Sequence, residues 1–278
     1  IVMTQLEVLE QHKSFNGQQI KYKHHSETLG CDMKFELYIP DTDQAIPLVW
    51  FLAGLSSTEE NFTHKAGFQR YAAERGYAFI MPDTSPRGED VPEGDNWDIG
   101  TGAGFYINAT EEPWNKHFKM YDYLTQELPE IVHEIIPNFN GQEAIMGHSM
   151  GGYGALLIGM KNPDRFTSIS AFAPITNPTK VPWGQKAFTT YLGEDESKWK
   201  EWDLVELIKA ADDLPPVYIT QGTADDFYEV QLVEDTFLAA AEGKDVTYET
   251  KEGYDHNYYF IATFVEDHID FHHKHFQV

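Results

Sequence analysis

The sequence predicts an α/β protein whose central sheet is mostly parallel, and three observations support this. Apolar runs alternate with helical patterns along most of the chain, which is typical of βαβ units; the runs lie at 47–52, 77–81, 143–148, 167–173, 216–220 and 246–250. The first forty residues instead contain consecutive strand patterns at 6–13, 18–26 and 31–39, with a hairpin signal at Asn16-Gly17. A Gly-x-Ser-x-Gly motif joins the apolar run at 143–148 to a helical pattern. We therefore expect antiparallel N-terminal strands, a mainly parallel sheet and helices on both of its faces.

Helical patterns occupy the intervals between the strands, at about 67–75, 120–136, 150–160, 229–242 and from 258 onward. Pro129 should kink the second of these or end it early, and Gly243 should cap the fourth. Asn140-Gly141 indicates a turn before the strand at 143–148. The stretch at 53–61 is polar, and we expect a loop there.

The length of 278 residues fits one large domain, residues 1–278, because no break in composition divides the chain. We expect an insertion with short helices at about 174–215. Residues 83–116 form a long stretch rich in Gly, Pro and Asp, whose aromatic residues argue that it is ordered. Its glycines at 100, 102 and 104 are only weakly similar to a nucleotide-binding loop, because no strand precedes them, and we exclude that reading.

Charge and composition exclude several classes of function. The formal net charge is −25, so nucleic acid and anionic membrane surfaces are not expected partners. No run of 18 apolar residues is present, so we expect no membrane span. Cys31 is the only cysteine, which rules out an intrachain disulfide and a cysteine-based zinc site and fits a reducing compartment.

The motif Gly147-His148-Ser149-Met150-Gly151 has the pattern of a nucleophile elbow. A serine on a sharp strand-to-helix turn is crowded by the residues two before and two after it, so both should lack a side chain. A glycine-rich turn without chemistry is the alternative interpretation. The context favours the elbow, because an apolar strand pattern precedes the motif and a helical pattern follows it.

A serine hydroxyl needs a base and an orienting carboxylate to act as a nucleophile, and this fold class supplies them in the order Ser, Asp or Glu, His. The loop after the strand at 216–220 offers Asp225 and Asp226; position in the loop favours Asp225 as the acid, with the other as a cap of the following helix. The loop after the strand at 246–250 offers His256 as the base. These loops should converge with Ser149 at the carboxyl edge of the sheet.

The other histidines are not expected to act in catalysis. His148 neighbours Ser149 on a strand, so it should point to the other side and pack behind the elbow. His268 and His272 lie at i, i+4 on the last helix, and a solvated helix face is favoured over a metal site because no third ligand follows. The backbone N–H groups of Met150 and Leu55 are the candidate donors to an oxyanion.

Four longer motifs resemble S-formylglutathione hydrolase, also called esterase D; they are AGLSSTEENF at 53–62, DNWD at 95–98 with GTGAGFY at 100–106, GHSMGG at 147–152 and GYDHNYYF at 253–260. The resemblance covers nearly the whole chain. It implies an α/β-hydrolase fold, no cofactor, a cytoplasmic location and a homodimer. It also implies hydrolysis of S-formylglutathione to glutathione and formate, the last step of glutathione-dependent formaldehyde removal, with side activity on short acyl esters.

Carried over by motif, the family's nucleophile, acid and base fall on Ser149, Asp225 and His256, and its oxyanion donors on Leu55 and Met150. One departure is Ser57, where many members carry a cysteine that makes them sensitive to thiol reagents. We therefore expect this chain to lack that sensitivity at Ser57.

The remaining expectations concern the substrate cleft. Trp97, Trp183 and Phe227 are candidate walls of a small acyl pocket, with ordinary aromatic core as the alternative. Because the chain is strongly acidic, a local basic group should meet the carboxylates of glutathione, and the sequence does not indicate which. A general short-chain carboxylesterase is the closest alternative function, and a non-catalytic binding protein of the same fold is the alternative from another class.

Overall fold

The computed structural model describes residues 5–277, so positions 1–4 and 278 of the expected domain lie outside it. The described strands are β1 (Glu7–Lys13), β2 (Gly17–Ser26), β3 (Cys31–Pro40), β4 (Ile46–Leu52), β5 (Ala78–Pro82), β6 (Phe139–His148), β7 (Phe166–Phe172), β8 (Val217–Gly222) and β9 (Val246–Lys251). The described α-helices are α1 (Glu60–Lys65), α2 (Gln69–Arg75), α3 (Met120–Asp122), α4 (Leu128–Ile135), α5 (Met150–Lys161), α6 (Pro182–Leu192), α7 (Leu204–Ala210), α8 (Tyr228–Gln231), α9 (Asp235–Ala240) and α10 (Tyr258–His275). Short 3-10 helices lie at η1 (Trp114–Lys116), η3 (Pro178–Lys180), η4 (Glu196–Lys198) and η5 (Lys200–Trp202), and η2 (Tyr123–Glu127) is π-helical.

All nine described strands form one sheet in the order β1-β2-β3-β5-β4-β6-β7-β8-β9. Three neighbouring pairs are antiparallel: β1 with β2, β2 with β3, and β3 with β5. The remaining five pairs, from β5 with β4 to β8 with β9, are parallel. The predicted fold class, with antiparallel N-terminal strands on a mainly parallel sheet, is therefore confirmed. β6 lies in the middle of the parallel part, so its carboxyl end faces the centre of the sheet edge where ligands bind.

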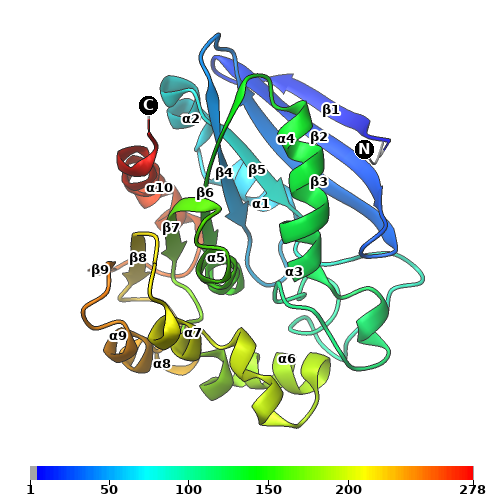
Figure 1. Cartoon of the computed structure of the whole chain (residues 1–278), viewed down its shortest axis with the longest axis vertical. Helices are drawn as coiled ribbons and strands as arrows, with labels where there is room; N and C mark the ends of the chain where they lie inside the picture. Colours follow the sequence, from blue (N-terminus) through cyan, green and yellow to red (C-terminus); the bar gives the residue numbers. More distant parts are fainter. Residues whose placement is uncertain (1–4, 278) are drawn as a thin grey trace.

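Helices cover both faces of the sheet (Figure 1). Strand β7 illustrates this, because its alternate residues contact a helix on one face and a different helix on the other. Successive residues of a strand point to opposite faces. Ile169 lies under α5, where a side chain at Gly159 would collide with it. Ser170 points the other way and hydrogen-bonds to His272 of α10. The helices α1 and α2 contact α10 on that second face.

His268 and His272 were expected on a solvated helix face, and this prediction is wrong, because they lie between α10 and the second face of the sheet. Both are fully buried, with Ser168, Ser170 and Thr220 hydroxyls within 2.7–2.9 Å of their ring nitrogens. Burial lowers the pKa of His272 to about 3 and that of His268 well below its ordinary value, so both rings are neutral. The alternation of serines in β7 was the signal for this polar layer.

The structure corrects three predicted boundaries, two of helices and one of a strand. The predicted loop at 53–61 ends early, because α1 begins at Glu60; just before it, the Thr58 hydroxyl accepts the Glu60 N–H and the Asn61 side chain accepts the Thr58 N–H. The predicted helix at 229–242 is split into α8 and α9. Asn140 and Gly141, predicted as a turn, lie inside β6, where Gly141 has φ +82°.

Two further segments show how the long connections are ordered. The predicted helix at 120–136 changes from α3 to the π-helical η2 before Pro129, which has no N–H to continue the α-helical ladder. In the long stretch at 83–116, Phe105 and Tyr106 are fully buried, as expected of an ordered loop. The segment between β7 and β8 carries η3, α6, η4, η5 and α7, in the range where an insertion is expected.

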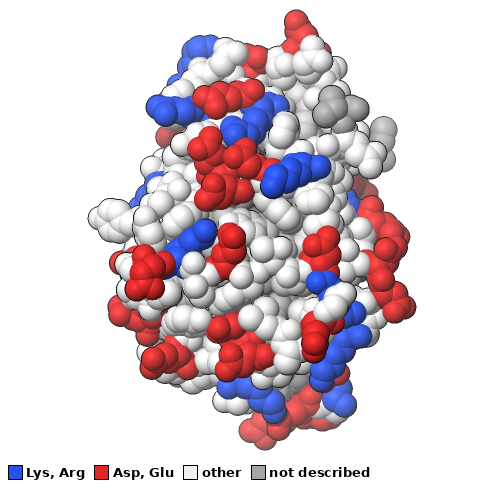
Figure 2. Space-filling view, turned by 90° about the vertical axis from the view of Figure 1, so that its left-hand side faces the viewer, with Lys and Arg blue, Asp and Glu red and all other residues white. Residues whose placement is uncertain are grey.

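The acidic residues are dispersed over the surface. On the face shown in Figure 2, Asp and Glu side chains occur in several separate groups with Lys and Arg set among them. None of the helices within residues 5–277 has the length and apolarity that crossing a membrane requires.

Candidate active site

Ser149 occupies the turn between β6 and α5 with φ +58° and ψ −116°. This backbone conformation is strained for a residue with a side chain, and it is held by hydrogen bonds on both sides. The Ser149 N–H donates to the Phe172 carbonyl at 3.0 Å, and its own carbonyl accepts the Tyr153 N–H at 3.0 Å. The turn therefore has the geometry of a nucleophile elbow, with the serine at the N-terminus of a twelve-residue helix.

The glycines on either side of Ser149 are sterically required, as the motif predicts. A Cβ on Gly147 would lie 2.0 Å from the Gly151 carbonyl oxygen, and a Cβ on Gly151 would lie 1.9 Å from the Leu52 carbonyl oxygen. These oxygens belong to the backbone of α5 and β4 and cannot move aside without displacing one of those elements. Only residues without a side chain allow α5 to begin this close to the sheet.

Asp225 and His256 meet across two loops at the carboxyl edge of the sheet. His256 Nδ1 lies 2.6 Å from Asp225 Oδ2, and the Asp225 side chain is completely buried. The carboxylate also accepts the Gln221 amide at 3.0 Å and the Phe227 N–H at 2.8 Å. With Nδ1 donating to the carboxylate, Nε2 of His256 is left as the hydrogen-bond acceptor. Asp226, the alternative acid, is exposed.

Ser149 and His256 line one cavity of about 370 Å³ at this edge. Trp97, Trp183 and Phe227, the three candidate walls, line it too. Their rings follow one another, with centroids 5.7 Å apart from Trp97 to Trp183 and 4.7 Å apart from Trp183 to Phe227. Phe227 in turn stands edge-on to His256, with ring centroids 5.1 Å apart. The apolar wall thus ends at the imidazole.

His148 differs from its expected place behind the elbow, because it also lines this cavity. Its ring centroid lies 4.5 Å from that of His256. Burial, and secondarily His256, lowers the pKa of His148 well below its ordinary value, so it is neutral beside the second imidazole. Strand alternation predicted the wrong direction because the strand ends at His148, where the backbone turns into the elbow.

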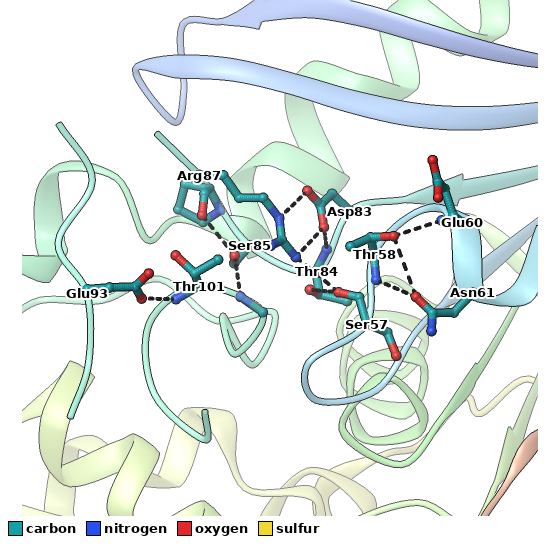
Figure 3. Close-up of polar contacts among 12 residues, drawn as sticks. Ser57, Thr58, Glu60, Asn61, Asp83, Thr84, Ser85, Arg87, Glu93 and Thr101 are labelled. Carbon is teal, nitrogen blue, oxygen red and sulfur yellow. Dashed lines mark hydrogen bonds and ion pairs between the residues drawn. The ribbon is translucent and has the colours of Figure 1, made fainter. Parts of the chain in front are cut away.

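The loop that carries Leu55 is held from two directions by the long stretch after β5 (Figure 3). From one side, the Ser57 carbonyl accepts the Thr84 hydroxyl at 2.6 Å and Arg87 Nη2 at 3.1 Å. Arg87 is itself oriented by Asp83, whose two carboxylate oxygens accept Nε at 2.7 Å and Nη2 at 3.0 Å. This bidentate pair gives the guanidinium one orientation.

From the other side, the Ser56 N–H donates to the Gly102 carbonyl at 2.9 Å, and the Gly102 N–H donates to the Ser85 hydroxyl at 2.8 Å. Ser56 has φ +65°, a conformation that costs energy for a serine and persists only when its surroundings impose it. The Tyr106 hydroxyl also donates to the Ala53 carbonyl at 2.7 Å. Hydrogen bonds therefore fix the backbone on both sides of Leu55.

Other residues of the cavity were not singled out by the sequence patterns. Asn61, Lys65, Asn257 and Tyr258 line it together with the predicted residues. Asn257 and Tyr258 directly follow His256 in the chain, and this proximity could have predicted that they line the cavity. Within residues 5–277, no group of three or more His, Cys, Asp or Glu side chains is placed to hold a metal ion.

Comparison with known proteins places this chain among esterases. The family model described as putative esterase matches residues 26–271. An S-formylglutathione hydrolase from Agrobacterium tumefaciens is 42% identical, with a TM-score of 0.95 over 98% of this chain and 100% of that one.

More distant structures share the fold. The fluorophosphonate-binding serine hydrolase F of Staphylococcus aureus is 23% identical, with a TM-score of 0.73 over 92% of this chain and 98% of that one. A ferulic acid esterase of Anaeromyces mucronatus is 17% identical, with a TM-score of 0.62 over 93% and 91%. The chain therefore belongs to the esterase family of α/β-hydrolase fold, and within it to the S-formylglutathione hydrolases.

Proposed function

We propose that this protein hydrolyses the thioester S-formylglutathione to glutathione and formate. The observation that carries the proposal is the 2.6 Å contact between His256 and Asp225 beside a cavity that Ser149 also lines. The relative from Agrobacterium tumefaciens, which is named for this activity, supports the choice of substrate. The cavity volume of about 370 Å³ suits a small acyl group and its reacting bond.

In the proposed mechanism, Ser149 Oγ attacks the formyl carbon while His256 Nε2 takes the hydroxyl proton. Asp225 holds the imidazole in the tautomer that leaves Nε2 free, and it stabilises the imidazolium that forms. The carbon–sulfur bond then breaks, and His256 returns the proton to the leaving thiolate. Water then attacks the formyl-serine while His256 takes its proton; the ester bond breaks, His256 returns the proton to Ser149 Oγ, and formate leaves.

The carbonyl oxygen becomes negatively charged during each attack, and the N–H groups of Leu55 and Met150 are the proposed donors to it. Met150 is the first residue of α5, where backbone N–H groups have no partner within the helix and the helix dipole favours negative charge. Leu55 contributes its N–H from the loop whose flanking groups are held by Thr84, Arg87 and Gly102.

The direct test compares kcat/KM for S-formylglutathione with that for a short aryl acetate. The proposal predicts much faster turnover of the thioester. Preference for the acetate would keep the proposed triad and assign the protein as a general short-chain carboxylesterase. Absence of turnover together with no labelling by a fluorophosphonate would favour a non-catalytic binding protein.

The homodimer and the cytoplasmic location that the family resemblance implies belong to the same proposal. Light scattering at micromolar concentration tests the dimer, which would appear at twice the chain mass of 31.8 kDa. A stable monomer would contradict this part without affecting the proposed chemistry.

A further inference from the structure

A second cavity adjoins the one above Ser149. It has a volume of about 450 Å³ and lies between the end of α1 and the start of α10, two helices that are in contact. Lys65, Asn257 and Tyr258 line both cavities, and Tyr259 and Ala262 complete the second. Tyr259 is 81% exposed, which leaves an aromatic residue largely uncovered at this place. The shared residues make the two cavities neighbours along one cleft.

The charge around this cleft is opposite to that of the molecule as a whole. The sequence contains 45 Asp and Glu residues and 20 Lys and Arg residues. Yet within the described part of the chain no Asp or Glu lines either cavity, and Lys65 is the lysine or arginine that does. Asp255 is two positions before Asn257 in the sequence, and its carboxylate accepts hydrogen bonds from the backbone N–H and the side-chain amide of Asn257.

Lys65 is also available to a ligand, in contrast to Lys186 of α6, the helix that carries Trp183. Lys186 lies between Asp95 and Asp98 at 2.9 and 2.8 Å, so its charge is compensated by the protein. Among residues 5–277, none of the ion pairs closer than 4.0 Å includes Lys65, whose ammonium group stands 5.8 Å from the centre of the Tyr258 ring. An uncompensated cation at the junction of two acid-free cavities favours an anion there.

We propose that Lys65 binds a carboxylate of the leaving group, which is a thiol that carries carboxylates, and that the second cavity holds the rest of this leaving group. This inference rests on the proposed function, since the leaving group of S-formylglutathione is a thiol peptide with two carboxylates. The formyl group is too small to need more than the first cavity. The thiol peptide extends from the reacting sulfur, and Tyr258 and Tyr259 provide flat surfaces against which its backbone can pack.

The test measures binding separately from thioester turnover. S-methylglutathione has no thioester to be hydrolysed and is used as an inhibitor of aryl acetate hydrolysis. It is compared with its diester, in which both carboxylates are esterified and therefore uncharged. Lys65→Met should raise the inhibition constant of S-methylglutathione about two- to fivefold, which is the upper part of the range for an exposed charge pair. The constant for the diester should change less than twofold. Lys65→Arg should restore tight inhibition, and Lys198→Met, which removes an exposed lysine elsewhere, should have no effect.

Equal weakening of both inhibitors, or no change in either, would overturn the role of Lys65 in carboxylate recognition. Absence of inhibition of the wild-type protein would overturn the proposed thiol site itself. Turnover of S-formylglutathione by the wild-type protein is measured in parallel. If S-methylglutathione binds through Lys65 but the formyl thioester is not cleaved, the proposed function fails while the binding site stands.

Discussion

Asp225 and His256 are joined by a 2.6 Å contact between Oδ2 and Nδ1, although 31 positions separate them in the chain. Two adjacent parallel strands, β8 and β9, make this possible, because their following loops leave the sheet at the same edge. The carboxylate is completely buried and accepts two further hydrogen bonds, so it presents one oxygen to the imidazole in a fixed direction.

The first prediction follows from that contact. Asp225→Asn should lower kcat about 10³- to 10⁴-fold with little change in KM, because the amide cannot hold His256 in the required tautomer. The neighbouring acid offers a matched control, since Asp226 is exposed and Asp226→Asn should keep its activity within about twofold. Equal loss in the two variants would contradict the assignment of Asp225.

The second prediction concerns the loop that carries Leu55. Thr84 is fully buried, and its hydroxyl donates to the Ser57 carbonyl at 2.6 Å. Thr84→Val removes that donor at almost constant volume, and we expect kcat to fall about tenfold with KM unchanged, as the Leu55 N–H loses part of its support. Thr84→Ser retains the hydroxyl and should recover most of the rate. A loss of stability that accompanies unchanged kcat in Thr84→Val would show that the hydrogen bond serves only the fold.

The third prediction concerns Glu59, whose pKa is raised from 4.5 to about 7 by burial and, secondarily, by Asp83. Below pH 4.5 this carboxyl is protonated in the folded and the unfolded chain and has no effect. Between pH 4.5 and 7 the folded protein keeps a proton that the unfolded chain has lost, so stability falls as the pH rises. Above pH 7 the full cost applies, at most about 3 kcal/mol.

Glu59→Gln should therefore raise the free energy of unfolding at pH 8 and leave it nearly unchanged at pH 4, as measured by denaturant titration. Glu60 provides a control of opposite sign, because its hydrogen bond with Lys21 lowers its pKa. Glu60→Gln should reduce stability at neutral pH, and the difference should vanish in acid. A gain from Glu59→Gln that does not depend on pH would contradict the shifted titration.

The fourth prediction concerns thiol reagents. Ser57 lines the active-site cavity, whereas Cys31 is half-buried and has its pKa raised by burial, which keeps its thiol protonated and slow to react. Activity of the natural protein should survive an alkylating agent. Ser57→Cys should place a thiol in the cavity and make activity sensitive to the same agent, with mass spectrometry to locate the adduct. Rapid inactivation of the unmodified protein through another site would contradict this expectation.

The local features of the candidate site could be predicted because they depend on residues close together in the chain. The elbow around Ser149 needs glycines two positions away on each side, and that requirement is visible as a motif. The order of Ser149, Asp225 and His256 follows from strands that each end in a loop at one edge. The strand and helix patterns sufficed for the sheet, since β6 to β9 pair in chain order.

The features that were missed depend on contacts between distant segments. Arg87 reaches back 30 residues to the Ser57 carbonyl, and no local pattern indicates such a bond. His268 and His272 have the spacing of an exposed polar stripe, yet serines of β7 make a buried partner for them. His148 faces the cavity because the strand ends there, which alternation along the strand cannot anticipate.

The central claim is that Ser149 is the nucleophile of a formyl thioester hydrolase. The most direct measurement is the turnover of S-formylglutathione by the wild-type protein and by Ser149→Ala, with circular dichroism to show that both are folded. We predict thioester turnover that is much faster than that of a short aryl acetate, and a loss of both activities by several orders of magnitude in the variant. Thioester hydrolysis that persists in a folded Ser149→Ala protein would contradict the claim.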